Sequence, residues 1–179
     1  MRTQRMILSG AVALALAMAP AAVAAQASDP EAPAPPSHWT GSTTSGPGFS
    51  VPNGEVGFFD WGYRTTMGLT FALESDDPRA AGDLQMVYVL DWSDKHDIGR
   101  GTGLARLTNE GGSFIGPVNV IYYPDGSEFR MALMEGQGGY DGLTYSMSNF
   151  LDGEGGEQSQ GLIWEGEPPA LPDAELLPG

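Results

Sequence analysis

Residues 99–134 read GRGTGLARLTNEGGSFIGPVNVIYYPDGSEFRMALM, in which short apolar runs alternate with two turn sequences. The turns are NEGG at 109–112 and PDGS at 124–127. Proline presets φ for the first turn position, aspartate can hydrogen-bond its own backbone, and glycine takes the left-handed conformation. The two turns therefore predict three consecutive antiparallel strands joined by tight hairpins.

The chain continues this pattern in both directions, with apolar runs at intervals of roughly ten to fifteen residues and no helical periodicity over three turns. We expect strands at 56–61, 65–73, 84–90, 101–108, 113–123, 128–134, 143–150 and 160–165. An antiparallel meander has two exposed edges unless it closes on itself. The sequence therefore predicts an all-β fold, an antiparallel closed or nearly closed barrel of about eight strands.

Glycine and proline positions favour closure over a flat sandwich. Gly99, Gly101 and Gly103 alternate, so along a strand they share one face. A face without side chains lets a strand bend sharply or lets another segment approach closely. Pro117 lies within an expected strand and indicates a bulge or a stretch with no neighbour on its N–H side.

The first residues have the three parts of a secretory signal peptide. Arg2 and Arg5 precede an apolar run at 6–19, and small residues follow Pro20. The run is shorter than the ~20 residues that span a bilayer, which disfavours the alternative of a membrane anchor. We therefore expect a signal peptide at 1–25, export to the periplasm or the extracellular space, and no membrane insertion after cleavage.

The remaining chain divides into three parts. The segment 26–52 is rich in proline, glycine and serine and is expected to form a disordered leader, with His38 and Trp39 docking its end onto the domain. The expected barrel domain covers 53–167. The proline-containing segment 168–179 is expected to be a flexible tail.

Composition excludes several classes of protein. The 179 residues include 8 Lys and Arg against 23 Asp and Glu, so the formal net charge is −15. Binding to phosphate backbones needs basic residues, so a basic nucleic-acid-binding protein is excluded. The chain has no cysteine, which excludes disulfides, Cys-ligated metals and a thiol nucleophile.

Five blocks carry a resemblance to known proteins: DPRAAG at 77–82, GTG at 101–103, NEGGSFIG at 109–116, YPDG at 123–126 and GQGGYDGL at 136–143. They resemble a group of small exported bacterial proteins of unknown function. More distantly, the glycine pattern is similar to the eight-stranded barrel of allene oxide cyclases and dirigent proteins. The resemblance covers about 77–166 and rests on turn and packing residues. It implies a barrel that binds a hydrophobic small molecule or steers its cyclisation or coupling, but none of the active-site residues of those families matches a position here.

Aromatic and apolar side chains alternate along the expected strands, so many of them face inward. The interior of an eight-stranded barrel is either filled by side chains or open enough for one small ligand. We expect a non-enzymatic barrel that binds a small apolar molecule, with Tyr122 and Tyr145 in contact with it. Arg106 and Arg130 are the expected polar anchors, because arginine is rare in this chain. A filled core is the alternative, and for the interior it is favoured over an open ligand cavity.

Two further function classes stay open. A cyclase- or isomerase-like enzyme acting on a hydrophobic small molecule would need a buried carboxylate with a raised pKa, for which Glu128 and Glu135 are candidates. A structural or protein-interaction module would show a contiguous exposed apolar patch. The sequence assigns no catalytic residue and no cofactor, and protein partners are unknown.

Two acidic segments, DWSDKHD at 91–97 and DGEGGE at 152–157, contain oxygen ligands of the kind that Ca²⁺ prefers. The spacing of the first segment lacks the alternating ligands and central glycine of an EF-hand loop. The second has flexible glycines between its carboxylates, and both segments are interpreted as solvated loops between strands. His96 could act as a general base near neutral pH, but no serine lies in a nucleophile-elbow pattern to partner it. The sequence therefore assigns no metal-binding residue.

Overall fold

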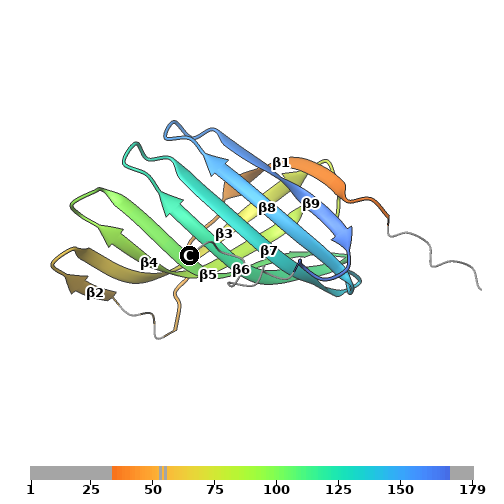
Figure 1. The fold of residues 1–179 in the computed structure, drawn as a ribbon, viewed down its shortest axis with the longest axis horizontal. Coiled ribbons are helices and arrows are strands. Elements are labelled where there is room, and N and C mark those ends of the chain that lie inside the picture. Colours follow the sequence, from red (N-terminus) through yellow and green to blue (C-terminus); the bar gives the residue numbers. More distant parts are fainter. Residues whose placement is uncertain (1–33, 53, 55, 170–179) are drawn as a thin grey trace, which may run out of the picture. The chain divides into compact units, whose positions relative to one another are not determined.

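The computed structural model describes residues 34–52, 54 and 56–169, and this part of the chain contains strands and turns but no helix. The strands are β1 (Ser37–Ser45), β2 (Val56–Phe59), β3 (Gly62–Ser75), β4 (Gly82–Ser93), β5 (Ile98–Asn109), β6 (Gly112–Tyr122), β7 (Glu128–Gly138), β8 (Leu143–Leu151) and β9 (Glu157–Glu165). All of the strand pairs are antiparallel (Figure 1). The eight strands expected from the sequence correspond to β2 through β9.

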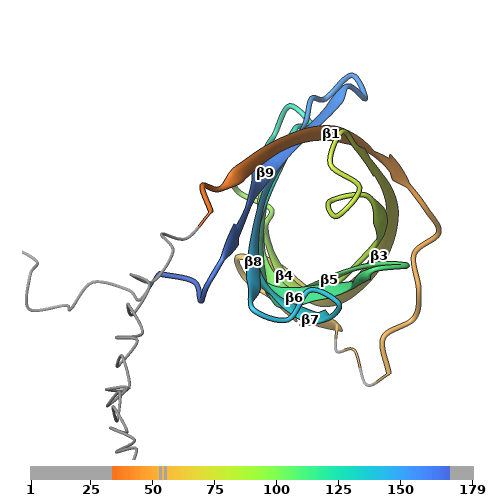
Figure 2. The ribbon, with the colours of Figure 1, turned by 90° about the vertical axis from the view of Figure 1, so that its right-hand side faces the viewer.

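Strands β3 to β9 form one meander in which each strand pairs with the next, and β1 closes it. The first half of β1, 37–41, pairs with β9, and its second half, 41–45, pairs with β3. The result is a closed ring of eight strands, with β2 attached only to β3 (Figure 2). The predicted all-β fold with a closed ring of about eight antiparallel strands is confirmed.

The prediction for the leader needs correction, because β1 lies within the segment 26–52. Trp39 faces the interior and is fully buried, and Thr43 follows it on the same face at 7 % exposure. Gly41 lies between them at the crossing point of the two pairings, where a Cβ would overlap the backbone oxygen of Glu74. Glycine, serine and threonine hide the alternation of this strand, so composition alone suggested an unstructured segment. The expected signal peptide and the expected tail after residue 169 lie outside the described residues.

The glycine stripe of β5 provides room inside the ring for two large side chains. A Cβ at Gly99 would lie 2.6 Å from Cε3 of Trp92, and a Cβ at Gly101 would lie 2.6 Å from Cδ2 of Tyr88. Both rings belong to the neighbouring strand β4 and lie across the glycines. The expectation that this face allows close approach is confirmed.

Pro117 interrupts the ladder between β6 and β7 without shifting its register. The pairing stops at Ile115 and Glu135 and resumes at Val118 and Ala132, so both strands skip the same number of residues. Neither of the two alternatives for this proline describes the structure. The register shows no bulge, and β7 stays alongside the strand, since a Cβ at Gly116 would overlap the backbone oxygen of Leu133.

Side chains fill the centre of the ring. The largest fully buried ones, each below 2 % exposure, are Trp39, Tyr88, Tyr145, Phe114, Leu84, Met86, Leu107, Met134, Met147, Ile163, Val118 and Val120. The β3–β4 loop covers one end, where Ala80 is fully buried, and it lies within the outline of the ring in Figure 2. The alternative of a filled core therefore describes the middle of the ring and this covered end.

We predict that Gly101→Ala destabilises the protein by about 1–3 kcal/mol, because the added methyl group displaces the buried ring of Tyr88. Thermal unfolding followed by circular dichroism measures the change, and Thr102→Val on the exposed face of the same strand is the control. Equal stability of the Gly101 variant and wild type would show that the ring of Tyr88 can move freely.

Candidate functional site

The end of the ring opposite the β3–β4 loop is formed by four hairpin turns, those between β2 and β3, β4 and β5, β6 and β7, and β8 and β9 (Figure 1). We call this end the mouth. A single row of directly paired residues follows the inner face of the strands there, from β2 to β9. The row consists of Phe58, Tyr63, Trp92, Gly99, Tyr122, Glu128, Leu151 and Glu157.

One side of the mouth row is aromatic. The rings of Phe58 and Tyr63 are 6.5 Å apart and inclined at 52°, those of Tyr63 and Trp92 are 6.2 Å apart and nearly parallel, and those of Trp92 and Tyr122 are 6.1 Å apart at 51°. Phe58 is 82 % exposed, and the other three rings are partly exposed. Gly99 has no side chain between Trp92 and Tyr122, which lets these two rings approach each other. Solvent therefore reaches a continuous row of four aromatic side chains.

The other side of the mouth is charged. Arg130 lies one inward position below Glu128 on β7 and binds both of its carboxylate oxygens, with Nε–Oε1 at 2.5 Å and Nη2–Oε2 at 2.8 Å. Nη1 of the same arginine donates to Oδ1 of Asn149 at 3.2 Å and to Oε1 of Glu157 at 3.3 Å. The guanidinium also lies 4.1 Å from the ring centre of Phe71. Two carboxylates thus share one arginine.

Burial makes this cluster energetically important. The side chains of Arg130 and Glu128 are 3 % and 6 % exposed, and that of Glu157 is 9 % exposed. A buried ion pair is stable only when further hydrogen bonds satisfy its remaining donors and acceptors. Here Asn149 does this, since its Nδ2 donates to Glu157 at 2.7 Å and to Oγ of Ser159 at 2.7 Å.

Two tyrosines connect the aromatic and charged sides of the mouth. The hydroxyl groups of Tyr88 and Tyr122 form a hydrogen bond with each other. Burial raises the pKa of both hydroxyls, and for Tyr122 the nearby charge of Glu128 raises it further. Both tyrosines are therefore neutral at physiological pH and can donate a hydrogen bond.

The structure brings together two of the four predicted ligand-binding residues. Tyr122 and Arg130 lie on the inner face at the mouth. Tyr145 lies in the packed centre, fully buried and stacked on Trp39 at 5.2 Å. Arg106 is exposed on the outer face of β5. Tyr145 is separated from the mouth because side chains fill the ring between them. Arg106 is separated from it because alternate residues of a strand face outward.

The two carboxylates considered for a catalytic role, Glu128 and Glu135, lie on opposite faces of the ring. Glu128 is 5 % exposed and paired with Arg130, whereas Glu135 is exposed on the outer face. The carboxyl group with the raised pKa is that of Glu157, which sequence reasoning placed only in an acidic loop. Trp92 was likewise assigned to a loop. It continues the alternation of Tyr88 and Leu90 along β4, and this signal could have identified it as an inward residue.

The acidic segments are accounted for by contacts within the protein. Asp91 forms a bidentate ion pair with Arg64, at 2.5 and 2.8 Å. Asp152 accepts hydrogen bonds from the backbone N–H groups of Glu154 and Gly156, which agrees with its interpretation as a loop residue. Within the described residues, no group of three or more Asp, Glu or His side chains could hold a metal ion.

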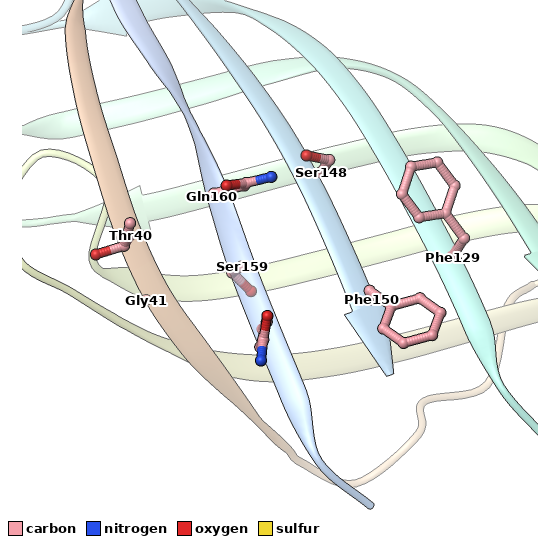
Figure 3. Close-up of a pocket in the computed structure, with 8 residues that line it drawn as sticks. Thr40, Gly41, Phe129, Ser148, Phe150, Ser159 and Gln160 are labelled. Atoms are coloured by element: carbon pink, nitrogen blue, oxygen red, sulfur yellow. The ribbon is translucent and has the colours of Figure 1, made fainter. Parts of the chain in front are cut away.

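The outer face of the ring also carries pockets. One has a volume of about 260 Å³ and is lined by Thr40, Gly41, Phe129, Ser148, Phe150, Gln158, Ser159 and Gln160. Figure 3 shows Phe129 and Phe150 at one side of it and Thr40 and Gln160 at the other. A second pocket, of about 640 Å³, includes Trp61 and Met131. These pockets are alternatives to the mouth as places where a ligand could bind.

We predict that Arg130→Met destabilises the protein by about 3–5 kcal/mol, because it leaves the carboxylate of Glu128 buried without a partner. Adding Glu128→Leu should recover much of this loss. Chemical denaturation measures all three proteins. The control is Arg64→Met, which breaks an ion pair of similar geometry on the surface and should change stability little. Equal effects of the two single variants would contradict the prediction.

The pH dependence of stability should reveal Glu157. Burial raises its pKa above the ordinary value of 4.5, the hydrogen bond from Asn149 and the charge of Arg130 partly oppose this rise, and Glu128 adds to it. A group whose pKa is raised on folding stabilises the protein fully below its unfolded pKa and less as pH rises through the folded pKa. The Tm of wild type relative to Glu157→Gln should therefore fall as the pH rises above 4.5. The exposed control Glu154→Gln should show no such trend.

Within the part of the chain that the structure describes, no helix is long and apolar enough to cross a membrane. Comparisons of the sequence with protein-family models and curated proteins, and of the fold with solved structures, give no match. The geometry of the mouth and of the outer face is therefore the basis for the function proposed next.

Proposed function

We propose that this chain is a non-enzymatic, exported binding protein that holds a small, largely apolar ligand against the aromatic row at the mouth of the ring. The observation that carries the proposal is the row itself, formed by Phe58, Tyr63, Trp92 and Tyr122 on one inner surface. Solvent-accessible aromatic rings supply a large apolar contact area at a small loss of conformational freedom.

The filled centre determines where such a ligand would bind. Side chains such as Met86 and Val120 have no exposed surface, so a ligand has no place deep in the ring. At the mouth, by contrast, Tyr63 and Trp92 are partly exposed. Tyr122, the last ring of the aromatic row, supplies a hydroxyl group that can orient a ligand. Arg130 holds the neighbouring carboxylate of Glu128 in place.

The enzyme alternative has weaker support. Glu128 would have to act as a general acid or base, but both of its carboxylate oxygens accept hydrogen bonds from Arg130. Such a pairing occupies both oxygens with contacts inside the protein, so neither oxygen is free to exchange a proton with a substrate. A binding role uses the cluster as it stands, since a fully satisfied polar network fixes the shape of the mouth.

A second candidate is a protein-interaction role for the outer face. Apolar side chains are exposed at outward positions on neighbouring strands, with Leu104 at 59 %, Met131 at 52 %, Phe150 at 45 % and Val89 at 43 %. Exposed apolar surface of this kind is common at binding surfaces for other molecules. The two candidates place the ligand on opposite faces of the same strands, so substitutions distinguish them.

The test uses the neutral apolar probe N-phenyl-1-naphthylamine and the protein purified from its own exporting cell. Binding should enhance probe fluorescence, and Trp92→Leu should weaken the affinity by about tenfold, since a central ring of the row is lost. Trp164→Leu is the matched control, because Trp164 lies on the outer face of β9 away from the mouth. If Met131→Ser abolishes binding and Trp92→Leu leaves it unchanged, the outer face is the binding surface and the proposal is wrong.

A further inference from the structure

The charge balance of the mouth indicates what kind of ligand its aromatic row would select. Glu128 and Glu157 face a single cation, Arg130, so the buried cluster has one carboxylate in excess. Arg130 already donates from Nε, Nη1 and Nη2 to groups of this chain and lies over Phe71. Its charge is therefore committed to contacts within the protein, and the cluster keeps one carboxylate in excess beside the mouth.

Glu157 is the group that carries this excess. Its two hydrogen bonds, from Arg130 and from Asn149, both end on Oε1. Among the described residues, none donates to Oε2. Burial is the main cause of the raised pKa of Glu157, because it disfavours the charged form of a carboxyl group that has, within the described part of the chain, no cation on its second oxygen. A cation that reaches this oxygen replaces the proton that the carboxyl group would otherwise bind.

The aromatic side of the mouth favours the same sign of charge. The face of an aromatic ring is negative, and rings around an ammonium group attract it more strongly when water is excluded. The outer pairs of the row are inclined at 52° and 51°, while the central pair is nearly parallel at 13°. The planes of the outer rings are therefore inclined to those of the central pair, so the row presents ring faces in more than one direction.

We propose that the ligand of the mouth is a small organic cation, an alkylammonium group whose apolar substituents contact Tyr63, Trp92 and Tyr122 and whose charge is balanced by Glu157. This inference rests on the proposed binding function and specifies its ligand class. A hard metal ion does not fit, because such ions take several oxygen ligands and most of this surface is aromatic. The formal charge of −15 on the chain adds long-range attraction for cations.

The test compares choline with its neutral isostere 3,3-dimethylbutan-1-ol, by isothermal titration calorimetry on the protein from its exporting cell. We expect choline to bind at least about tenfold more tightly, because only choline gains cation–π attraction and the charge of Glu157. Trp92→Leu should abolish this preference. Added salt should weaken choline binding and leave the isostere unaffected.

Charge variants locate the effect. Glu157→Gln should weaken choline binding by about three- to tenfold and leave the isostere unchanged, since only the charge is removed. Glu154→Gln removes the same charge from the exposed turn before β9 and should have little effect. If the two variants weaken choline equally, the net charge of the protein accounts for the binding and the assignment to Glu157 is overturned.

The remaining outcomes distinguish a wrong ligand class from a wrong binding function. Equal affinity for choline and the isostere, or no choline binding by protein that still binds N-phenyl-1-naphthylamine at the mouth, overturns the cationic ligand and retains the binding function. Failure of all three probes to bind overturns both.

Discussion

The pairing of β1 with both β9 and β3 is the constraint on which the rest of the structure depends. It turns a meander with two free edges into a closed ring, and a closed ring gives every inward residue neighbours on all sides. Trp39 illustrates the consequence, because it reaches zero exposure only when the strands on both sides of β1 are in place. Closure of the ring by β1 therefore produces both the packed centre and the solvated mouth.

Within that ring, glycine and aromatic side chains complement each other. Where β5 has no inward side chain, at Gly99 and Gly101, Trp92 and Tyr88 occupy the space. The same principle acts at the covered end, where the ring of Trp39 lies 2.8 Å from the position that a Cβ of Gly161 would take. Aromatic side chains that lie next to glycines fill the narrow interior without pushing the strands apart. The same complementarity determines which aromatic side chains meet at the mouth. Core packing and the candidate site therefore both depend on where the glycines lie in β5.

Sequence reasoning recovered most of the ring because hairpin turns and alternation are local signals. The turns at 109–112 and 124–127 and the eight expected strands agree with β2 to β9. It missed β1, whose Ser, Thr and Gly residues resemble those of a linker. It also grouped residues of the mouth with residues that lie elsewhere in the ring. Tyr122 and Glu157 lie on one row only through the register of four strands, and that register is not a property of any short segment. Tyr145 and Arg106 show the same limit, since neither depth in the ring nor face can be derived from residue type.

The location of the polar cluster argues for function more strongly than its composition does. Replacing a buried ion pair with well-packed apolar residues is often neutral or stabilising, so stability alone gives little reason to keep Glu128 and Arg130 inside a ring that Met, Leu and Val fill elsewhere. The cluster lies beside the one inner surface where aromatic rings remain accessible to solvent. Its surplus carboxylate, Glu157, lies on the mouth row itself. Stability alone does not explain this combination, whereas the proposed selection of a ligand by charge at the mouth would use both the accessible rings and the surplus carboxylate.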